Sequence, residues 1–334
     1  MPINLSIFHS PLHRRLRNGL WLAGGFLLCG RLLSAVPATS RFDLAAAPRL
    51  LVVEKFLHDR HHVLQSFAFD PRNGEIYAVQ VEGTDAAGTW AEHGKRGDLT
   101  LSRLSADGDS VLGHMELRGF GHGVAIGVEA SGAGVFLWTE VDSHPNTGNS
   151  GRGLRLGRFA FVDGTTLDAR SPAITKYSLV DGAVSATPGL DALHGYLAVR
   201  YVVGGRFHVA LFKLAAVKAG DRTPLADFIC PSDIGTFQGW ATWGSHVYFY
   251  AGNNYSDTNL PPGNAMLYCY DWNTGRELQR VRTEVFRNQL WREPEGIAVR
   301  TNGLRPQLVF GVSSHLPGKN DRTISLAAID RLVP

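Results

Sequence analysis

The sequence predicts an all-β protein, a five-bladed β-propeller in which residues 49–334 form a single domain. A pattern of two short apolar strands joined by a tight glycine turn occurs five times, at a spacing of roughly 45 to 70 residues, as expected for one unit repeated around an axis. Helical periodicity is almost absent, and the 38 glycines suit a chain with many tight turns.

The five copies share a strand, a turn and a second strand of alternating aromatic and β-branched residues. They are QSFAFDPRNGEIYAVQ from Gln65, HGVAIGVEASGAGVFLWTE from His122, ATPGLDALHGYLAVRY from Ala186, FQGWATWGSHVYFYAGN from Phe237 and EGIAVRTNGLRPQLVFGVSS from Glu295. The third copy lacks the polar residue that opens the others. Each copy is expected to begin a four-stranded blade, and the strands of the first blade are predicted near residues 65–70, 75–80, 98–104 and 109–117.

One strand at the start of the domain has no blade of its own. Residues 49–56 (RLLVVEKF) read as a strand, whereas the last blade has only three, which start at Glu295, Gln307 and Thr323. We therefore expect residues 49–56 to supply the fourth strand of the last blade, which closes the ring and removes exposed sheet edges.

Residues 1–38 have the composition of a cleavable export signal. The basic segment HRRLR precedes an apolar run over residues 19–30 and small residues near Ala38, after which we expect cleavage, with residues 39–48 as a short lead-in. Adjacent Arg14 and Arg15 leave the twin-arginine route open. About twelve apolar residues are too few to cross a bilayer as a helix, so we expect no stable membrane span after cleavage. The predicted location is secreted or cell-wall associated.

Charge and cysteine content limit the possible partners. Four of the 33 Lys and Arg residues lie in the expected signal, so 29 of them are balanced by 30 Asp and Glu residues in the remainder. A near-neutral chain without a basic run argues against nucleic-acid binding. Cys230 and Cys269 remain after cleavage, and either a disulfide or two buried thiols fits their positions.

The repeat also predicts which polar side chains meet. The first strand of each blade begins, and the second ends, on the same face, so residues at these points surround the central channel. The strand-opening residues are Gln65, His122, Gln238 and Glu295. The strand-ending residues are Gln80, Glu140, Arg200 with Tyr201, Asn253, and Ser313 with His315.

Long polar loops on this face are interspersed with tryptophans, as in sugar-binding surfaces, where amides pair with hydroxyls and aromatic rings cover CH groups. The expected ligand-binding residues are Gln65, Gln80, Gln238, Trp240, Asn253 and His315. The glycines on either side of His122 favour a channel-facing role for it. An equally good interpretation is that Gln65 and Gln238 hydrogen-bond to backbone groups around the channel, and that Trp240 packs between blades.

Two chemistries are available if this face is catalytic. A polysaccharide lyase would use His122 or Tyr255 as base, with Arg200 to stabilise the developing enediolate. A glycoside hydrolase would use two carboxyl groups, Glu140 with Glu295 or Glu293. A protein-interaction scaffold is a further alternative.

No cofactor is expected. Oxygen ligands near Asp142 and Asp257 leave Ca²⁺ binding open, although no EF-hand spacing occurs.

The segments QSFAFDPRNGEIYAVQ, GFGHGVAIGVE and FLWTEVD resemble a group of secreted actinobacterial proteins described as teichoic acid biosynthesis protein C. They are also similar to the propeller of certain staphylococcal phage receptor-binding proteins. The resemblance covers residue 49 to the C-terminus and implies a five-bladed propeller that meets cell-wall glycopolymers. With the channel face, it leads us to expect a monomer that binds teichoic acid or a related anionic glycan. The resemblance implies no catalytic residues.

Overall fold

The computed structural model describes residues 35–132, 134–145, 150–303 and 305–334. Only residues 35–38 of the expected export signal belong to the described part of the chain, so most of that prediction lies outside the described residues. Within the described part of the chain, no helix has both the length and the apolar character of a membrane span.

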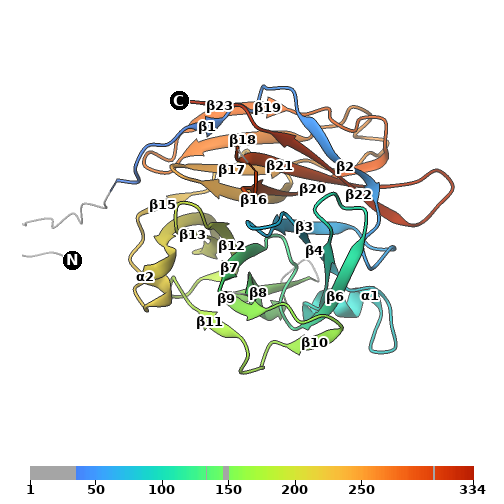
Figure 1. Ribbon diagram of the computed structural model, residues 1–334, viewed down its shortest axis with the longest axis horizontal. Coiled ribbons are helices and arrows are strands. Elements are labelled where there is room, and N and C mark those ends of the chain that lie inside the picture. The colour runs from blue at the N-terminus through green and yellow to red at the C-terminus, as the bar shows by residue number, and fades with distance from the viewer. Residues whose placement is uncertain (1–34, 133, 146–149, 304) are drawn as a thin grey trace, which may run out of the picture. The chain divides into compact units, whose positions relative to one another are not determined.

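Five sheets of at least four strands confirm the predicted five-bladed all-β architecture (Figure 1). Blade 1 contains β3 (Leu64–Phe69), β4 (Ile76–Val81), β5 (Leu99–Leu104) and β6 (Val111–Arg118). Blade 2 contains β7 (Gly127–Ser131), β8 (Gly134–Pro145), β9 (Gly151–Ala160) and β11 (Thr175–Tyr177). Blade 3 contains β12 (Val184–Asp191), β13 (Tyr196–Val203), β14 (Arg206–Lys213) and β15 (Ala226–Ile229). Blade 4 contains β16 (Phe237–Trp243), β17 (His246–Ala251), β18 (Met266–Asp271) and β19 (Glu277–Arg282).

The fifth blade is completed by an N-terminal strand, as the sequence predicts. The strand order is β2-β22-β21-β20, in which β2 (Arg49–Lys55) runs antiparallel to β22 (Arg322–Ile329). The inner strands are β20 (Leu290–Arg300) and β21 (Gln307–His315). The first and last blades are therefore joined through strands from opposite ends of the domain.

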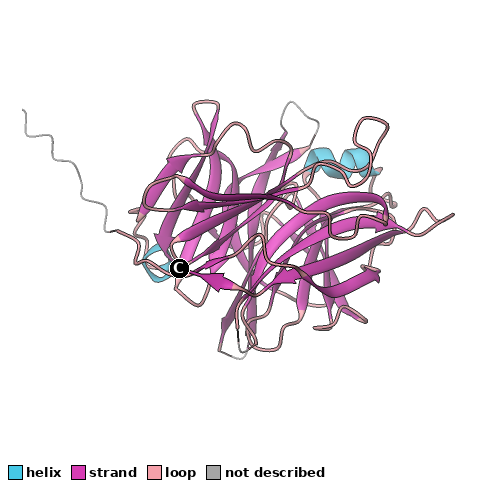
Figure 2. Cartoon of the chain, turned by 90° about the horizontal axis from the view of Figure 1, so that it is seen from above, coloured by secondary structure: helices cyan, strands magenta, loops and turns pink. Residues whose placement is uncertain are grey.

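Five short elements were not predicted. Beyond the fifth blade, β1 (Arg41–Phe42) pairs with β23 (Leu332–Val333). A further strand, β10 (Thr165–Asp168), leaves blade 2 and runs parallel to β6, so that blade 1 has five strands rather than four. Figure 2 shows the two short helices among the strands, α1 (Trp90–Arg96) and α2 (Leu214–Lys218).

The segment before β1 packs along blade 4. Asn273 exchanges two hydrogen bonds with the backbone of Val36, which is 2% exposed. The backbone N–H of Phe42 donates to the Tyr248 hydroxyl at 3.0 Å. Cleavage after Ala38 stays a prediction, and it would remove the contacts of Val36.

The second blade begins later than expected, at Gly127 rather than at His122. Residues 119–126 run as a loop whose backbone groups bond partly to side chains and partly to backbone: the N–H groups of Phe120 and Gly121 both donate to the Gly97 carbonyl oxygen, at 2.7 and 3.0 Å. The Glu140 carboxylate accepts from two of their N–H groups, and the Ser66 hydroxyl donates to the Gly123 carbonyl oxygen at 2.6 Å.

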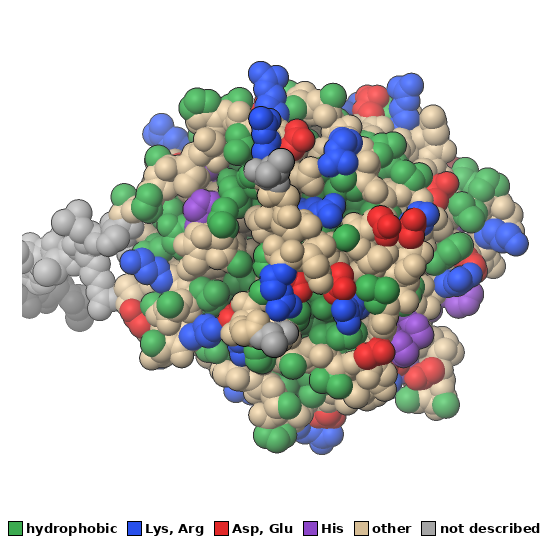
Figure 3. Space-filling model, viewed as in Figure 1, with side chains coloured by type: hydrophobic (Ala, Val, Ile, Leu, Met, Phe, Trp, Pro, Cys, Tyr) green, Lys and Arg blue, Asp and Glu red, His purple; other side chains and the backbone are tan. Residues whose placement is uncertain are grey.

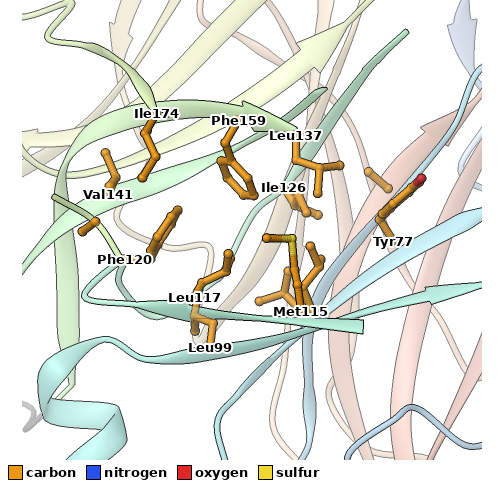
Figure 4. Close-up of a cluster of buried hydrophobic side chains, with 14 of the residues drawn as sticks. Tyr77, Leu99, Met115, Leu117, Phe120, Ile126, Leu137, Val141, Phe159 and Ile174 are labelled. Carbon is orange, nitrogen blue, oxygen red and sulfur yellow. The ribbon is translucent and has the colours of Figure 1, made fainter. Parts of the chain in front are cut away.

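A cluster of apolar side chains between blades 1 and 2 holds this loop in place (Figure 4). Phe120, which is fully buried, packs edge-on against Phe159 of β9, with ring centroids 5.3 Å apart. Leu117 of blade 1 and Leu137 of blade 2 belong to the same cluster. Burial of Phe120 therefore anchors the chain two residues before His122.

Of the two arrangements that the sequence left open for Cys230 and Cys269, the structure shows two free thiols.

Candidate ligand-binding site

A cavity of about 790 Å³ lies where the blades converge at the loop-bearing end of the channel, and all five blades contribute to its wall. Gln65, Arg200, Gln238 and Glu295 line it from four different blades, and His122 lines it from the loop that leads into blade 2. The third blade, which lacks an opening polar residue of the same kind, contributes the small hydroxyl side chains of Ser185 and Thr187 as well. The repeat thus brings together residues that lie far apart in the sequence.

Arg200 is the most distinctive group in the cavity wall. It lies on β13, is only 8% exposed, and its guanidinium carbon lies 3.7 Å from the ring centroids of both Phe207 and Phe237. Its Nε donates no hydrogen bond to any described residue. Burial lowers the pKa of Arg200 to about 10, so the side chain is still a cation at neutral pH. An anionic or strongly polar ligand that accepts a hydrogen bond from Nε would stabilise this buried cation.

The charge of the cavity is positive overall. Arg152 and the exposed Arg206 also line it, and Glu295 is the one carboxyl residue among the described residues of its wall. Burial, with a smaller effect from the Glu293 carboxyl, raises the pKa of Glu295 well above its usual value, which favours the uncharged form. Across the face shown in Figure 3, by contrast, basic and acidic side chains are interspersed.

His122 presents an imidazole without a hydrogen-bond partner for Nδ1 within the described structure. Loss of hydration on burial, reinforced by the charge of Arg152, lowers its pKa to about 3. The ring is therefore neutral at physiological pH and offers one donor and one acceptor.

Glu140 lies behind the cavity wall and holds the backbone next to His122. Its side chain is fully buried and accepts hydrogen bonds from the backbone N–H groups of His122, Gly123 and Gly153 at 2.9, 2.8 and 2.6 Å. A Cβ atom at Gly121 would lie 2.2 Å from the Glu140 carboxyl carbon, so only glycine fits there. Glu140 does not line the cavity, and its two oxygens are already occupied.

Other expected site residues lie elsewhere. Gln80 donates to the carbonyl oxygens of Asp59 and His62 at 2.8 and 2.6 Å. Trp240 is 3% exposed and donates to the Thr187 hydroxyl at 3.2 Å, where it packs between blades 3 and 4. Neither side chain lines the cavity.

Three further expected residues lie outside the cavity wall: Asn253 and Tyr255 in the loop after β17, and His315 at the end of β21. The Tyr255 hydroxyl donates to the carbonyl oxygen of Arg287 at 3.1 Å. The Asn253 N–H donates to Asn264 Oδ1 at 2.9 Å, and His315 Nδ1 lies 3.2 Å from the Leu316 carbonyl oxygen. His122 and Arg200 thus share the cavity without Tyr255, and Glu295 lines it without Glu140.

Sequence reasoning missed Arg152, Phe207 and Phe237. Arg152 is the second residue of β9 and Phe207 the second residue of β14, so both follow second strands that end on the channel face. Phe237 immediately precedes Gln238 at the start of β16. Residues at the start of the third strands also face the channel, and including them in the sequence analysis would have identified Arg152 and Phe207.

Comparison with known proteins identifies relatives of the propeller. The family model described as "Phage 5-bladed beta propeller receptor binding platform domain" matches residues 63–323. The Bacillus subtilis (strain 168) protein named "Putative major teichoic acid biosynthesis protein C" is 30% identical over 297 residues, which are 85% of this chain and 62% of that protein. The chain thus spans less than two thirds of this curated relative.

Solved structures with a related fold include the tail fiber of Staphylococcus aureus phage P68. The TM-score is 0.65 at 20% identity, over 86% of this chain and 54% of the tail fiber chain. A GH43_1 enzyme from Xanthomonas citri complexed with xylose gives a TM-score of 0.42 at 11% identity, over 86% of this chain and 93% of that chain. Likeness at that level carries no argument about activity.

Proposed function

Because the chain belongs to the family of phage five-bladed β-propeller receptor-binding platform domains, we propose that the protein binds an anionic extracellular glycopolymer in its channel cavity. The observation that carries this proposal is Arg200, a buried cation between two aromatic rings whose Nε has no partner among the described residues. A phosphate or carboxylate group would satisfy it. The proposal includes the exported location expected from residues 1–38.

The remaining cavity wall suits a sugar or polyol chain. Phe207 is 41% exposed and offers an apolar face for CH groups, while Gln65 and neutral His122 provide hydrogen-bonding groups for hydroxyls. The name of the Bacillus subtilis relative, which refers to teichoic acid biosynthesis, supports a cell-wall polymer, and we therefore favour a teichoic acid, whose repeating anion is a phosphodiester.

Recognition has more support than turnover. Hydrolysis of a glycosidic bond uses two carboxyl groups, and Glu140 is occupied by backbone donors behind the wall. A lyase base works best with a pKa near the working pH, whereas the pKa of His122 is lowered to about 3.

Binding of the purified protein to defined polymers tests the proposal. Titration calorimetry with glycerol-phosphate and ribitol-phosphate polymers, a polyuronate and neutral dextran should give binding to the polyanions and none to dextran. Affinity should fall as salt is raised, because charge contributes to it. Release of reducing ends and ultraviolet absorbance of unsaturated uronate, followed in the same samples, would reveal turnover.

Arg200→Gln links binding to the cavity. We expect this change to weaken polyanion binding about tenfold or more, since it removes a charge-assisted contact. Arg276→Gln is the matched control, because Arg276 is exposed and does not line the cavity. Equal loss in both variants, or no loss in Arg200→Gln, would contradict binding at this site.

A further inference from the structure

Three buried groups without a partner lie in one half of the channel cavity wall. They are Arg200 Nε, Arg152 Nη1 and His122 Nδ1, and none of them forms a hydrogen bond with the described residues. All three side chains line the cavity. Arg152 belongs to blade 2, His122 to the loop that leads into it, and Arg200 to the neighbouring blade 3. Because buried polar groups without a partner are costly, three of them in one wall indicate a ligand that pairs with all three.

The backbone fixes the position of Arg152 in the cavity wall. Arg152 lies on β9, which pairs with β8, and it stands between two glycines. A Cβ atom at Gly151 would overlap Ser143 Oγ, and a Cβ atom at Gly153 would overlap the side chain of Glu140. The two strands can therefore approach closely only because both neighbours of Arg152 lack a side chain.

The contacts of Arg200 hold its guanidinium group without neutralising its charge. The rings of Phe207 and Phe237 both lie with their centroids 3.7 Å from the guanidinium carbon, and the Cys230 thiol forms a hydrogen bond with this group. Burial raises the pKa of Cys230 to about 11, so the thiol is neutral at physiological pH. None of the partners of Arg200 named here carries a negative charge, and its cation is free to pair with an anion in the cavity.

The two guanidinium groups lie close enough to influence each other. Burial lowers the pKa values of His122 and Arg200, and the positive charge of Arg152 lowers both further. Burial also lowers the pKa of Arg152, whereas the Glu140 carboxyl group acts in the opposite direction. Both arginines remain cations at neutral pH, so the empty cavity holds two like charges. One anion between them would relieve this repulsion.

We propose that Arg152, Arg200 and His122 together bind one phosphate group of the polymer, so that the cavity selects phosphate-containing polyanions over carboxylate-containing ones. The inference rests on the proposed function of the cavity and adds Arg152 as a specificity-determining residue. The oxygens of a phosphate point in tetrahedral directions, and two of them can each accept from a different guanidinium group. The two oxygens of a carboxylate lie in one plane, which suits a single guanidinium group better than donors from two blades. The neutral His122 ring adds a donor when its proton is on Nδ1.

The other half of the cavity wall carries neutral polar groups. Gln65, Gln238 and Glu295 line it from blades 1, 4 and 5. The Gln238 amide donates to the Gly252 carbonyl oxygen at 2.9 Å, and burial raises the pKa of Glu295, which favours its carboxylic acid form. Such groups suit the hydroxyls of a polyol or sugar next to the phosphate. The asymmetry of the wall therefore fits one phosphate on blades 2 and 3, with the rest of the repeating unit across the channel.

Binding of the full chain to two kinds of polyanion tests this selectivity. A glycerol-phosphate polymer should bind at least about tenfold more tightly than a polygalacturonate of similar length. Arg152→Gln should weaken binding of the phosphate polymer about tenfold or more and that of the polygalacturonate about threefold or less, so that the preference is lost. Arg206→Gln is the matched control, because Arg206 lines the same cavity but is exposed. It should weaken both polymers by the same small factor.

Phosphorus NMR observes the proposed contact directly. Glycerophosphoglycerol, a single diester unit, and glycerol phosphate, a monoester like a chain end, are the two probes. The protein should shift or broaden the phosphorus resonance of the diester, and Arg152→Gln should abolish the effect. A response of the monoester alone would support the phosphate site and identify the end of the polymer as its ligand. No response of either probe would contradict the site.

Arg152→Lys separates geometry from charge. It keeps a cation but loses the planar guanidinium group, so it should lose most of the preference for phosphate, and the melting temperature shows that the variant is folded. Equal affinity of the wild type for both polymers, with each dependent on Arg200, would overturn this inference and leave the proposed function intact. Absence of binding to every polyanion would contradict both.

Discussion

Glu140 and Gly153 are joined by a hydrogen bond of 2.6 Å from the Gly153 backbone N–H to Glu140 Oε2. The other carboxylate oxygen holds the backbone of His122 and Gly123. One buried side chain therefore ties the loop before blade 2 to β9, and the Glu140 carboxylate takes the place of a strand partner for His122 and Gly123.

Glu140→Gln should lower the free energy of unfolding by about 2 kcal/mol, because an amide has one acceptor oxygen and its NH₂ group opposes a backbone donor. Urea denaturation measures the loss, and hydrogen exchange should show faster exchange at the His122, Gly123 and Gly153 amides. Glu284→Gln, at a side chain that is 47% exposed, is the control. Unchanged exchange at these three amides would contradict the role assigned to Glu140.

Glu129 should make stability depend on pH. Burial raises the pKa of its carboxyl, but hydrogen bonds from Arg158, Lys218 and Trp138 outweigh burial and lower the pKa from 4.5 to about 2. Because the folded pKa is the lower one, the stabilisation is present above pH 4.5 and is lost as the pH falls toward 2.

The wild type should exceed Glu129→Gln by about 3 kcal/mol in unfolding free energy at neutral pH. The difference should shrink below pH 4.5. Denaturant titrations over a pH series measure it, with exposed Asp257→Asn as the control. A difference that is constant with pH would show that the Glu129 charge is not responsible.

Closure of the ring depends on the inward side of β2. Val52 is 2% exposed, whereas Val53, the next residue on the same strand, is 44% exposed. Val52→Asp should lower the unfolding free energy by about 3 kcal/mol, because it places a carboxyl group in the core. Val53→Asp should change it by about 0.5 kcal/mol or less. Similar melting temperatures for the two variants would argue against closure by this strand.

His122→Ala should weaken polyanion binding several-fold, about one kcal/mol, while it leaves the melting temperature nearly unchanged. The ring is neutral because its pKa is lowered to about 3, so its contribution should not vary between about pH 5 and pH 8. Calorimetric titrations at several pH values measure both effects. Lost stability with unchanged binding would make His122 structural.

The repeat made both the fold and the strand-opening residues of the cavity predictable. Gln65, Gln238 and Glu295 line the cavity because the inner strands all start at the same end of the channel. Strand-ending residues were harder to predict, since a side chain at the end of a strand points toward the channel or toward a neighbouring loop. Arg200 lines the cavity, whereas Gln80 turns to the carbonyl oxygens of Asp59 and His62.

Contacts that do not follow the repeat could not be predicted from it. The pairing of β10 with β6 and of β1 with β23 involves short segments without a period-2 signal. The groups that donate hydrogen bonds to Glu140 are backbone N–H groups, and the pattern of side chains in the sequence does not reveal them.

The pairing of β2 with β22 also determines when the ring can close during synthesis of the chain. Arg49 pairs with Ala328, so one partner emerges among the first residues of the domain and the other among the last. Until the fifth blade has been made, the growing polypeptide carries an unmatched strand, and the distant pairing makes the final step slow. The ring can therefore close only after β22 has been synthesised, and until then β2 lacks its partner strand.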